Sequence, residues 1–232
     1  MAPSASTAPA VSASPSASAA PTKAPADKVT KAEKAQAKLD LNAGLKVSRT
    51  TSKVTVKWGK VKKADRYDIY AAYCGKDNKC EKVLTVSGSK KKAVIKKLNG
   101  KELDRQKDIK VYVVAYRKVN GKETKLAKSI TGHVVGDKNT KYTNAKSIKL
   151  KKTKYSLKAG NTKTVKAELV LEDKKKKAMP KSHVATFRYA SSNTKVAKVD
   201  KNGKITAVGK GTCYIYVYAA NGLAKKVKVT VK

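Results

Sequence analysis

From Ala145 to the C-terminus the chain alternates short β-type runs with turn signals. Segments such as SIKL, GTCYIYVYA and KKVKVTV have strand length and are rich in β-branched or aromatic residues. Gly and Asn separate the runs at near-regular spacing, as in SNTKVAKVDKNGKITAVGKG. Several short strands with turns between them are typical of an antiparallel β-sandwich. This part of the chain is therefore predicted to be all-β and to act as a spacer or a binding surface.

Residues 45–137 show a second set of strand-length runs, with strong turn dipeptides at Asn99-Gly100 and Asn120-Gly121. Strict alternation in these runs places one set of side chains on the inward faces of the strands. That set is Val54, Val56, Trp58, Tyr67, Ile69, Ala71, Tyr73, Ile109, Val111, Val113 and Ala115. Seven strands in about ninety residues predict a second sandwich.

The N-terminal segment has a different composition. Ala2 to Ala26 is almost entirely Ala, Ser, Pro and Thr, which cannot bury enough apolar surface to offset ordering, so we expect disorder. A short helix is expected within Asp27–Leu39, with a thin apolar stripe of Val29, Ala32, Ala35 and Leu39. The predicted organisation is a disordered segment with this helix (1–40), one sandwich (41–137) and a second sandwich (138–232). A polar, exposed linker near Val135–Asn144 is expected to join two independently folded domains.

Residues 45–137 resemble a fibronectin type III domain of the bacterial surface-protein kind. The matching elements are Trp58, the ADRYDIY segment, the VYVVAY strand and the VNGK turn. Ile109 stands where this family often has the tyrosine that opens the sixth strand, so the tyrosine-corner hydrogen bond is expected to be absent. No RGD tripeptide occurs, so the integrin-binding motif of animal relatives does not carry over.

Residues 145–232 resemble the group 2 bacterial immunoglobulin-like domain. The matching segments are SIKL at 147–150, LKAGNT at 157–162, YASSNTKVAKVDKNGKITAVGKGT at 189–212, and the terminal VKVTV. Tyr189 replaces the family's usual tryptophan. Together the two resemblances imply a secreted or cell-surface protein that works in adhesion, in contact with polysaccharide or host surfaces, or as a spacer.

The charge of the chain is extreme, with 55 Lys and Arg against 16 Asp and Glu and a net charge of +39. Residues 45–137 carry a net +16 and residues 138–232 a net +21, so both predicted domains are basic. Only five of the basic residues are arginines, and bidentate reading of phosphates or base edges favours arginine. The charge therefore indicates loose attraction to polyanions, and not specific nucleic-acid binding. General solubility is an equally good explanation.

Three cysteines are present. Cys74 and Cys80 bracket a short polar loop, and we favour a disulfide between them over free thiols, which would imply an oxidising, extracellular setting. Cys213 is predicted to be a buried free thiol. The C-x5-C spacing is unusual for zinc, and His133 and His183 are the only histidines, so no metal site is expected.

The sequence contains no recognisable catalytic motif, and we predict no enzyme activity, no catalytic residues and no cofactor. The candidate binding surface has two parts. Alternation in the GTCYIYVYA run points its tyrosines outward, and a lysine run falls in a predicted exposed loop. These residues are Tyr214, Tyr216, Tyr218, Lys174, Lys175, Lys176 and Lys177. Packing against the linker or the neighbouring domain is the competing explanation for the tyrosines.

The predicted function is non-enzymatic binding or adhesion by a secreted or cell-surface monomer. Its expected partners are anionic polysaccharides or a host-surface glycoprotein or receptor, with no specific nucleic acid and no transmembrane segment. The first residues contain no apolar h-region, as in a mature secreted protein whose signal peptide has been removed, and equally as in a cytosolic protein with a disordered tail. The alternative function is a diffusible fibronectin type III ligand for a host receptor, by fold-level analogy with the hormone irisin.

Overall fold

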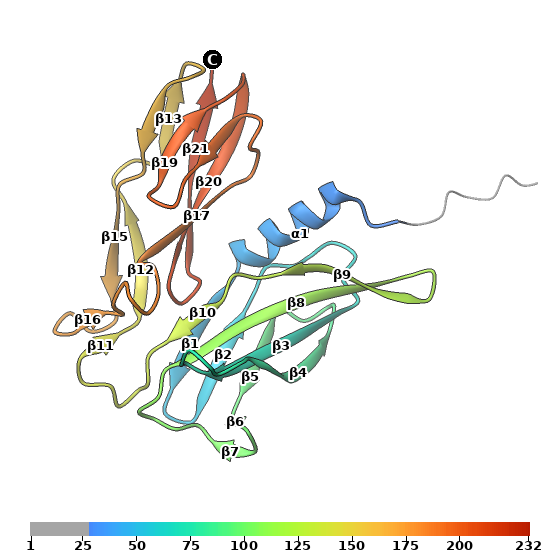
Figure 1. Cartoon of the computed structure of the whole chain (residues 1–232), viewed down its shortest axis with the longest axis vertical. Coiled ribbons are helices and arrows are strands. Elements are labelled where there is room, and N and C mark those ends of the chain that lie inside the picture. Colours follow the sequence, from blue (N-terminus) through green and yellow to red (C-terminus); the bar gives the residue numbers. More distant parts are fainter. Residues whose placement is uncertain (1–27) are drawn as a thin grey trace, which may run out of the picture.

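The computed structural model describes residues 28–232, so the disorder predicted for residues 2–26 lies outside the described residues. The all-β class is confirmed, because one helix is followed by two β-sandwiches (Figure 1). Among the described residues, no helix has the length and apolarity needed to cross a bilayer.

Helix α1 runs from Lys31 to Ala43 and starts with a capping box. The Thr30 hydroxyl accepts a hydrogen bond from the Glu33 amide (3.1 Å), and the Glu33 carboxylate accepts one from the Thr30 amide (2.7 Å). The predicted apolar stripe is wrong at Ala32 and Ala35, which are exposed, whereas Val29 and Leu39 are half-buried. The fully buried apolar side chains of the helix are Ala37 and Leu41, which pack into the core of the first sandwich.

Two sheets form the first sandwich, and their pairings are antiparallel. The first sheet has the order β1-β2-β5, with β1 (Lys46–Thr50), β2 (Lys53–Lys57) and β5 (Lys92–Ile95). The second has the order β10-β8-β3-β4, with β9 also paired to β8. Its strands are β3 (Arg66–Tyr73), β4 (Glu81–Ser87), β8 (Ile109–Val119), β9 (Lys122–Lys128) and β10 (Gly132–Val134). A small hairpin joins β6 (Lys97–Leu98) to β7 (Lys101–Glu102).

The core of the first sandwich follows the predicted alternation. Every inward residue of the β8 run (Ile109, Val111, Val113 and Ala115) is fully buried, and Trp58 packs against Tyr67 with ring centroids 5.3 Å apart. Asn120 and Gly121 have φ of 50° and 76° and form the predicted tight turn between β8 and β9.

The second sandwich contains a sheet of order β13-β21-β20-β17, with β13 (Lys154–Leu157), β17 (Phe187–Ser191), β20 (Gly211–Ala219) and β21 (Ala224–Val231). Strand β13 pairs in parallel with β21, while the other two pairs of this sheet are antiparallel. Opposite it lie the pair β12 (Ala145–Leu150) and β15 (Ala167–Leu171), and the sheet β14-β19-β18. The strands of that sheet are β14 (Thr162–Thr164), β18 (Ala197–Val199) and β19 (Lys204–Ala207). As predicted, Cys213, Ile215 and Val217 of β20 point into the core.

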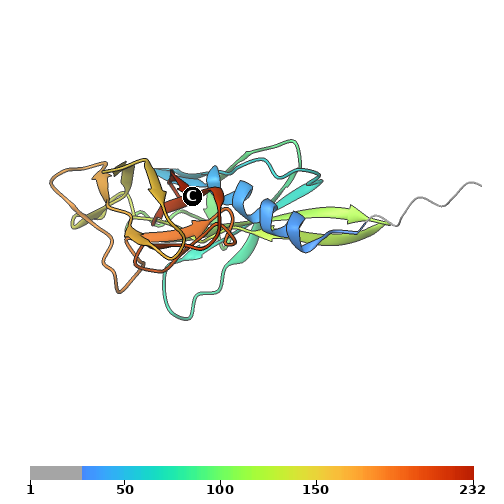
Figure 2. The same ribbon diagram turned by 90° about the horizontal axis from the view of Figure 1, so that it is seen from above.

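The two sandwiches meet at a hydrogen-bonded junction. The turn between β20 and β21 lies against β1 and β10, and its Asn221 and Ala220 carbonyls accept hydrogen bonds from the Val47 and His133 amides (2.9 and 2.8 Å). Within the first sandwich, a Cβ on Gly132 would lie 2.5 Å from Val47 Cγ2, so the close approach of β10 to β1 at this junction requires glycine. Helix α1 occupies the angle between the two sandwiches and runs along the β8–β9 hairpin (Figures 1 and 2).

The predicted exposed linker is instead tied down. Asp137 lies 2.7 Å from Arg105 and 3.5 Å from Arg49, two basic groups of the first sandwich. Further along, β11 (Tyr142–Thr143) pairs with β16 (Lys177–Ala178) of the second sandwich. The linker prediction was wrong on this point because its polar residues bond to the protein and not only to water.

Candidate functional site

An aromatic surface covers the outer face of β3 and β8. We call Tyr70, Tyr112 and Tyr116 the tyrosine platform. Tyr70 and Tyr112 are cross-strand partners whose rings stack with centroids 4.9 Å apart and an interplanar angle of 12°. All three tyrosines are half-buried, so part of each ring remains open to solvent.

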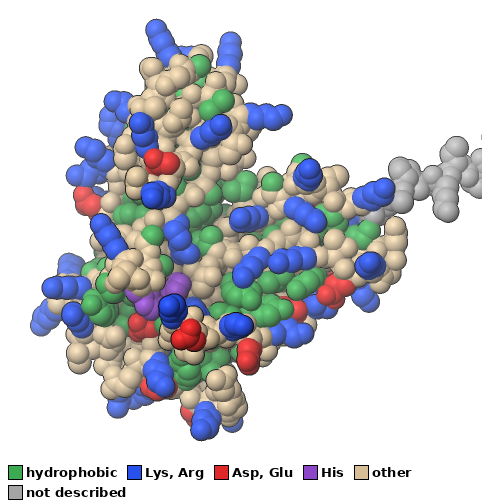
Figure 3. Space-filling view, in the orientation of Figure 1, with side chains coloured by type: hydrophobic (Ala, Val, Ile, Leu, Met, Phe, Trp, Pro, Cys, Tyr) green, Lys and Arg blue, Asp and Glu red, His purple; other side chains and the backbone are tan. Residues whose placement is uncertain are grey.

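Basic side chains surround the platform. Lys128 Nζ lies 3.7 Å from the Tyr112 ring centroid, and the Arg66 guanidinium lies 4.6 Å from the Tyr116 ring centroid. Figure 3 shows side chains of the green apolar and aromatic class gathered around β8, with Lys and Arg on their borders. Desolvation, together with a hydrogen bond to Tyr70, raises the pKa of Tyr116 to about 12, so its hydroxyl stays neutral. The face offers flat rings, hydroxyls and cations together, which is chemistry suited to sugar rings or acidic groups.

A buried carboxylate, that of Asp68, holds the arginine beside the tyrosine platform in place. Asp68 is 1% exposed, and its Oδ1 accepts hydrogen bonds from Thr85 Oγ1 (2.8 Å) and Arg66 Nε (3.1 Å). Arg66 also pairs with Glu123 of β9. Arg66 is therefore held by two acids and fixed in position over the Tyr116 ring.

The three tyrosines of β20, which were predicted to form a binding surface, differ from one another in burial. We call Tyr214, Tyr216 and Tyr218 the tyrosine row. Tyr214 and Tyr216 are half-buried, with Lys226 Nζ 4.3 Å from the Tyr214 ring centroid. Tyr218 is only 1% exposed, so its assignment to the binding surface was wrong. The end of β20 runs into the junction, and periodicity along one strand does not reveal what covers its outer face.

Arg188 reinforces that junction beside Tyr218. Its guanidinium donates hydrogen bonds to the carbonyls of Thr131 in the first sandwich (2.7 Å) and of Ala219 and Ala220 in the second (2.9 and 3.2 Å). Burial lowers the pKa of Arg188 to about 10 and, more than any other cause, raises the pKa of Tyr218. The side chain ties one domain to the other.

The lysine run is mostly exposed. Lys174 and Lys175 lie in a turn, and Lys177 starts β16. Lys176 is the exception, because it is half-buried and its Nζ donates a hydrogen bond to the Asn139 carbonyl (2.8 Å). Three of the four predicted lysines are thus exposed to solvent.

All five arginines have partners within the chain, and blue Lys and Arg side chains are spread over both domains (Figure 3). Each arginine forms a hydrogen bond or ion pair within the chain; the residues are Arg49, Arg66, Arg105, Arg117 and Arg188. The charge offered to a partner therefore comes almost entirely from lysine, a strongly hydrated point charge.

The predicted disulfide is not formed, because Cys74 and Cys80 are both free thiols. The side chains have different neighbours: Cys80 Sγ lies 3.8 Å from the Lys110 carbonyl, and Cys74 Sγ lies 3.6 Å from His133 Nδ1. Cys213 is free and buried.

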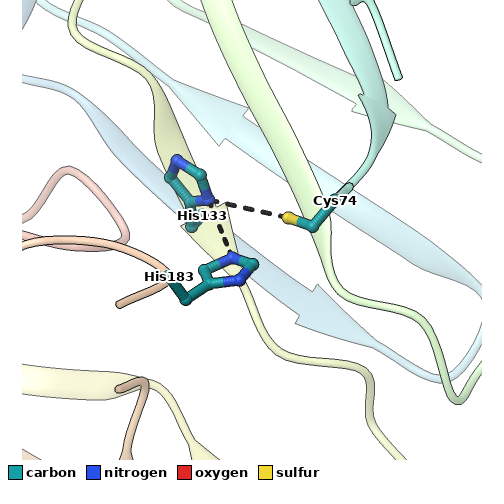
Figure 4. Close-up of side chains that lie close together, drawn as sticks. All are labelled: Cys74, His133 and His183. Carbon is teal, nitrogen blue, oxygen red and sulfur yellow. Dashed lines mark hydrogen bonds between the residues drawn. The ribbon is translucent and has the colours of Figure 1, made fainter. Parts of the chain in front are cut away.

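The chain's two histidines come together beside Cys74, a grouping that sequence spacing did not indicate (Figure 4). His133 Nδ1 lies 3.3 Å from His183 Nε2, and the donor atoms of Cys74, His133 and His183 all lie within 4.8 Å of one another. Desolvation lowers the pKa of His133 to about 4 and raises the pKa of the Cys74 thiol to about 12. At neutral pH, the His133 ring is therefore neutral and has a lone pair to donate.

The match to a known protein family falls on the second sandwich. The family described as the intimin immunoglobulin-like domain matches residues 177–221. No curated protein sequence matches the chain.

Solved structures with some likeness include an intimin mutant from EHEC O157:H7 (18% identity, 36% of this chain and 45% of that one, TM-score 0.28). Domains 4 and 5 of the S-layer protein SbsC are 17% identical over 53% of this chain and 64% of that one, with a TM-score of 0.30. Fibronectin(III)-like modules of Clostridium thermocellum CbhA are 12% identical over 79% of this chain and 87% of that one, with a TM-score of 0.28. The chain spans less than half of the intimin structure, and at these TM-scores the likenesses carry no argument about function.

Proposed function

We propose that the chain is a non-enzymatic binding protein of the cell surface or the secreted fraction, whose lysine-covered sandwiches contact anionic polysaccharides or host-surface glycans. The observation that carries this proposal is that the arginines and the lysines of the chain have different positions. Arginines hold the fold together, while lysines supply the outward charge on both domains. The partial match to an intimin immunoglobulin-like domain supports a surface-binding role.

The binding would be driven by charge and would have low selectivity. A polyanion that meets many lysines releases condensed counterions, so its affinity falls steeply as salt rises. A hydrated lysine ammonium group gains little affinity from being held in a fixed geometry. No single lysine is therefore expected to supply most of the binding affinity.

The test is a salt titration of binding to heparin, with neutral dextran as the control surface. The proposal predicts binding to heparin only, with affinity falling steeply and linearly on a log–log plot against salt. Affinity that stays constant through physiological salt, or equal binding to neutral dextran, would reject it.

The alternative is a diffusible ligand for a host receptor, and the tyrosine platform is the observation that favours it. Stacked, anchored aromatic rings form the kind of compact patch that dominates protein–protein binding energy. Under this alternative, host-cell binding would survive physiological salt and would be lost when Tyr112 is replaced.

A further inference from the structure

We propose that Cys74, His133 and His183 form a zinc(II) site that clasps the two sandwiches together. The site is separate from the glycan-binding surface and goes beyond the proposed function. It uses both histidines of the chain and one of its three cysteines.

The fold itself assembles the donors. Strand β8 lies between β3 and β10, and Lys110 of β8 is the cross-strand partner of both Ala72 and His133. Cys74 is two residues beyond Ala72, and side chains two apart in a strand share a face. Cys74 and His133 therefore point to the same outer face of the first sandwich, on either side of β8.

The second sandwich supplies the third donor. His183 lies in the segment between β16 and β17, in a turn closed by a hydrogen bond from its amide to the Pro180 carbonyl (2.9 Å). The neighbouring junction bond from the His133 amide to the Ala220 carbonyl (2.8 Å) holds β10 against the second sandwich. Domain docking thus places His183 beside His133, with the two rings edge to face and their centroids 5.2 Å apart (Figure 4).

The distances between the donor atoms fit a tetrahedral zinc ion. With Zn–S of about 2.3 Å and Zn–N of about 2.0 Å, tetrahedral geometry separates S from N by roughly 3.5 Å and two N atoms by roughly 3.3 Å. The measured separations are 3.6 Å for Cys74 Sγ to His133 Nδ1 and 3.3 Å for His133 Nδ1 to His183 Nε2. The remaining pair, Cys74 Sγ and His183, lies within 4.8 Å, which a side-chain rotation can close.

The donor set also selects the metal. One thiolate and two imidazoles suit a borderline-soft ion such as zinc, and a hard ion such as Ca²⁺ or Mg²⁺ prefers oxygen. A bound ion displaces the thiol proton of Cys74. His183 is exposed, so water can fill the fourth position of the ion.

Cobalt(II) binding provides the direct test, because a cobalt–thiolate bond gives a charge-transfer absorption band. The full chain, untagged, reduced and stripped by chelator, is titrated with Co²⁺ and then with Zn²⁺. We expect one cobalt per chain with a thiolate band, and displacement of the cobalt by zinc. Cys74→Ser should abolish the band, and His183→Gln should weaken binding by more than the roughly 10–100-fold that losing an outer-shell partner costs.

Cys80→Ser is the matched control, since Cys80 is a neighbouring half-buried thiol outside the group, and it should leave the band unchanged. The absence of a thiolate band would overturn the proposal, as would an unchanged band in both ligand variants or its loss in Cys80→Ser. A Cys74–Cys80 disulfide in protein recovered from culture supernatant would overturn it too.

A second measurement tests whether the metal links the two sandwiches. Zinc should raise the thermal unfolding midpoint of the wild type and leave that of His183→Gln unchanged, because the variant has no donor from the second sandwich. His183 is exposed, so this variant is expected to fold. An equal zinc-induced shift in both proteins would show that the metal does not bridge the domains.

Discussion

Strands β8 and β20 carry the same pattern, with aliphatic side chains inward and tyrosines outward, yet their tyrosines have different surroundings. The platform tyrosines Tyr112 and Tyr116 of β8 remain partly open to solvent, between Lys128 and Arg66. Tyr218 of β20 is buried at the junction beside Arg188. Alternation determines which face a side chain takes, whereas the neighbouring domain determines whether that face is free to bind.

The largest expected effect comes from removing the buried member of the tyrosine row. Tyr218→Ala should destabilise the protein by about 3 kcal/mol, because it leaves a cavity under the junction. Tyr112→Ala is the matched control on β8 and should cost under about 1 kcal/mol, since the side chain is only partly buried and lies at the surface. Chemical denaturation measures the free energy of unfolding of both variants. Equal losses of stability would contradict the difference in burial between the two strands.

Arg188→Ala should cost about 2 kcal/mol, because it removes the hydrogen bond that crosses to the Thr131 carbonyl and two further bonds to the Ala219 and Ala220 carbonyls. It should also loosen the domains, so that limited proteolysis cuts between residues 136 and 144. The wild type should resist cleavage there because its linker is bonded to both sandwiches. Rapid cleavage of the wild type would show that the junction does not hold the domains.

Tyr112→Ser tests whether the platform contributes to binding. If stacking and the Lys128 contact position a glycan, affinity for that glycan should fall about threefold to tenfold, or roughly 0.7–1.4 kcal/mol. Tyr214→Ser is the control on the other sandwich and should change affinity less. A larger loss of affinity in Tyr214→Ser would show that the binding surface lies on β20 and not on the tyrosine platform.

The smallest effect is expected from the lysine loop. Replacing Lys174, Lys175 and Lys177 with Gln should reduce heparin affinity only modestly and lower the salt slope by about one per contacting lysine. Lys176→Gln is a control, because Lys176 already bonds to Asn139. Complete loss of heparin binding in the triple variant would show one localised site in place of diffuse attraction.

The sequence predicted the interiors of both sandwiches well and the surfaces between them poorly. The alternation of Ile109, Val111, Val113 and Ala115 directly encodes one buried face. The burial of Tyr218 depends on residues from a second domain, which leave no periodic trace in β20. The disulfide between Cys74 and Cys80 was predicted from their closeness in the sequence, and the structure instead has two free thiols.

The Cys74, His133 and His183 cluster was missed for a related reason. Its members are 59 and 50 positions apart, and only strand pairing and domain docking bring them together. Looking for local metal-binding motifs therefore could not find it. The one available signal was that the chain has only two histidines, and a search for long-range partners would start with them.

Chemical nitration of tyrosines in the native protein, mapped by mass spectrometry, tests most directly the claim that docking buries one tyrosine surface and leaves the other free. The account predicts that Tyr112 is modified readily and that Tyr218 is protected until the protein unfolds, in line with their exposures. Modification of Tyr218 as fast as Tyr112 in the native protein would contradict it, because the two sandwiches would then not share a fixed junction.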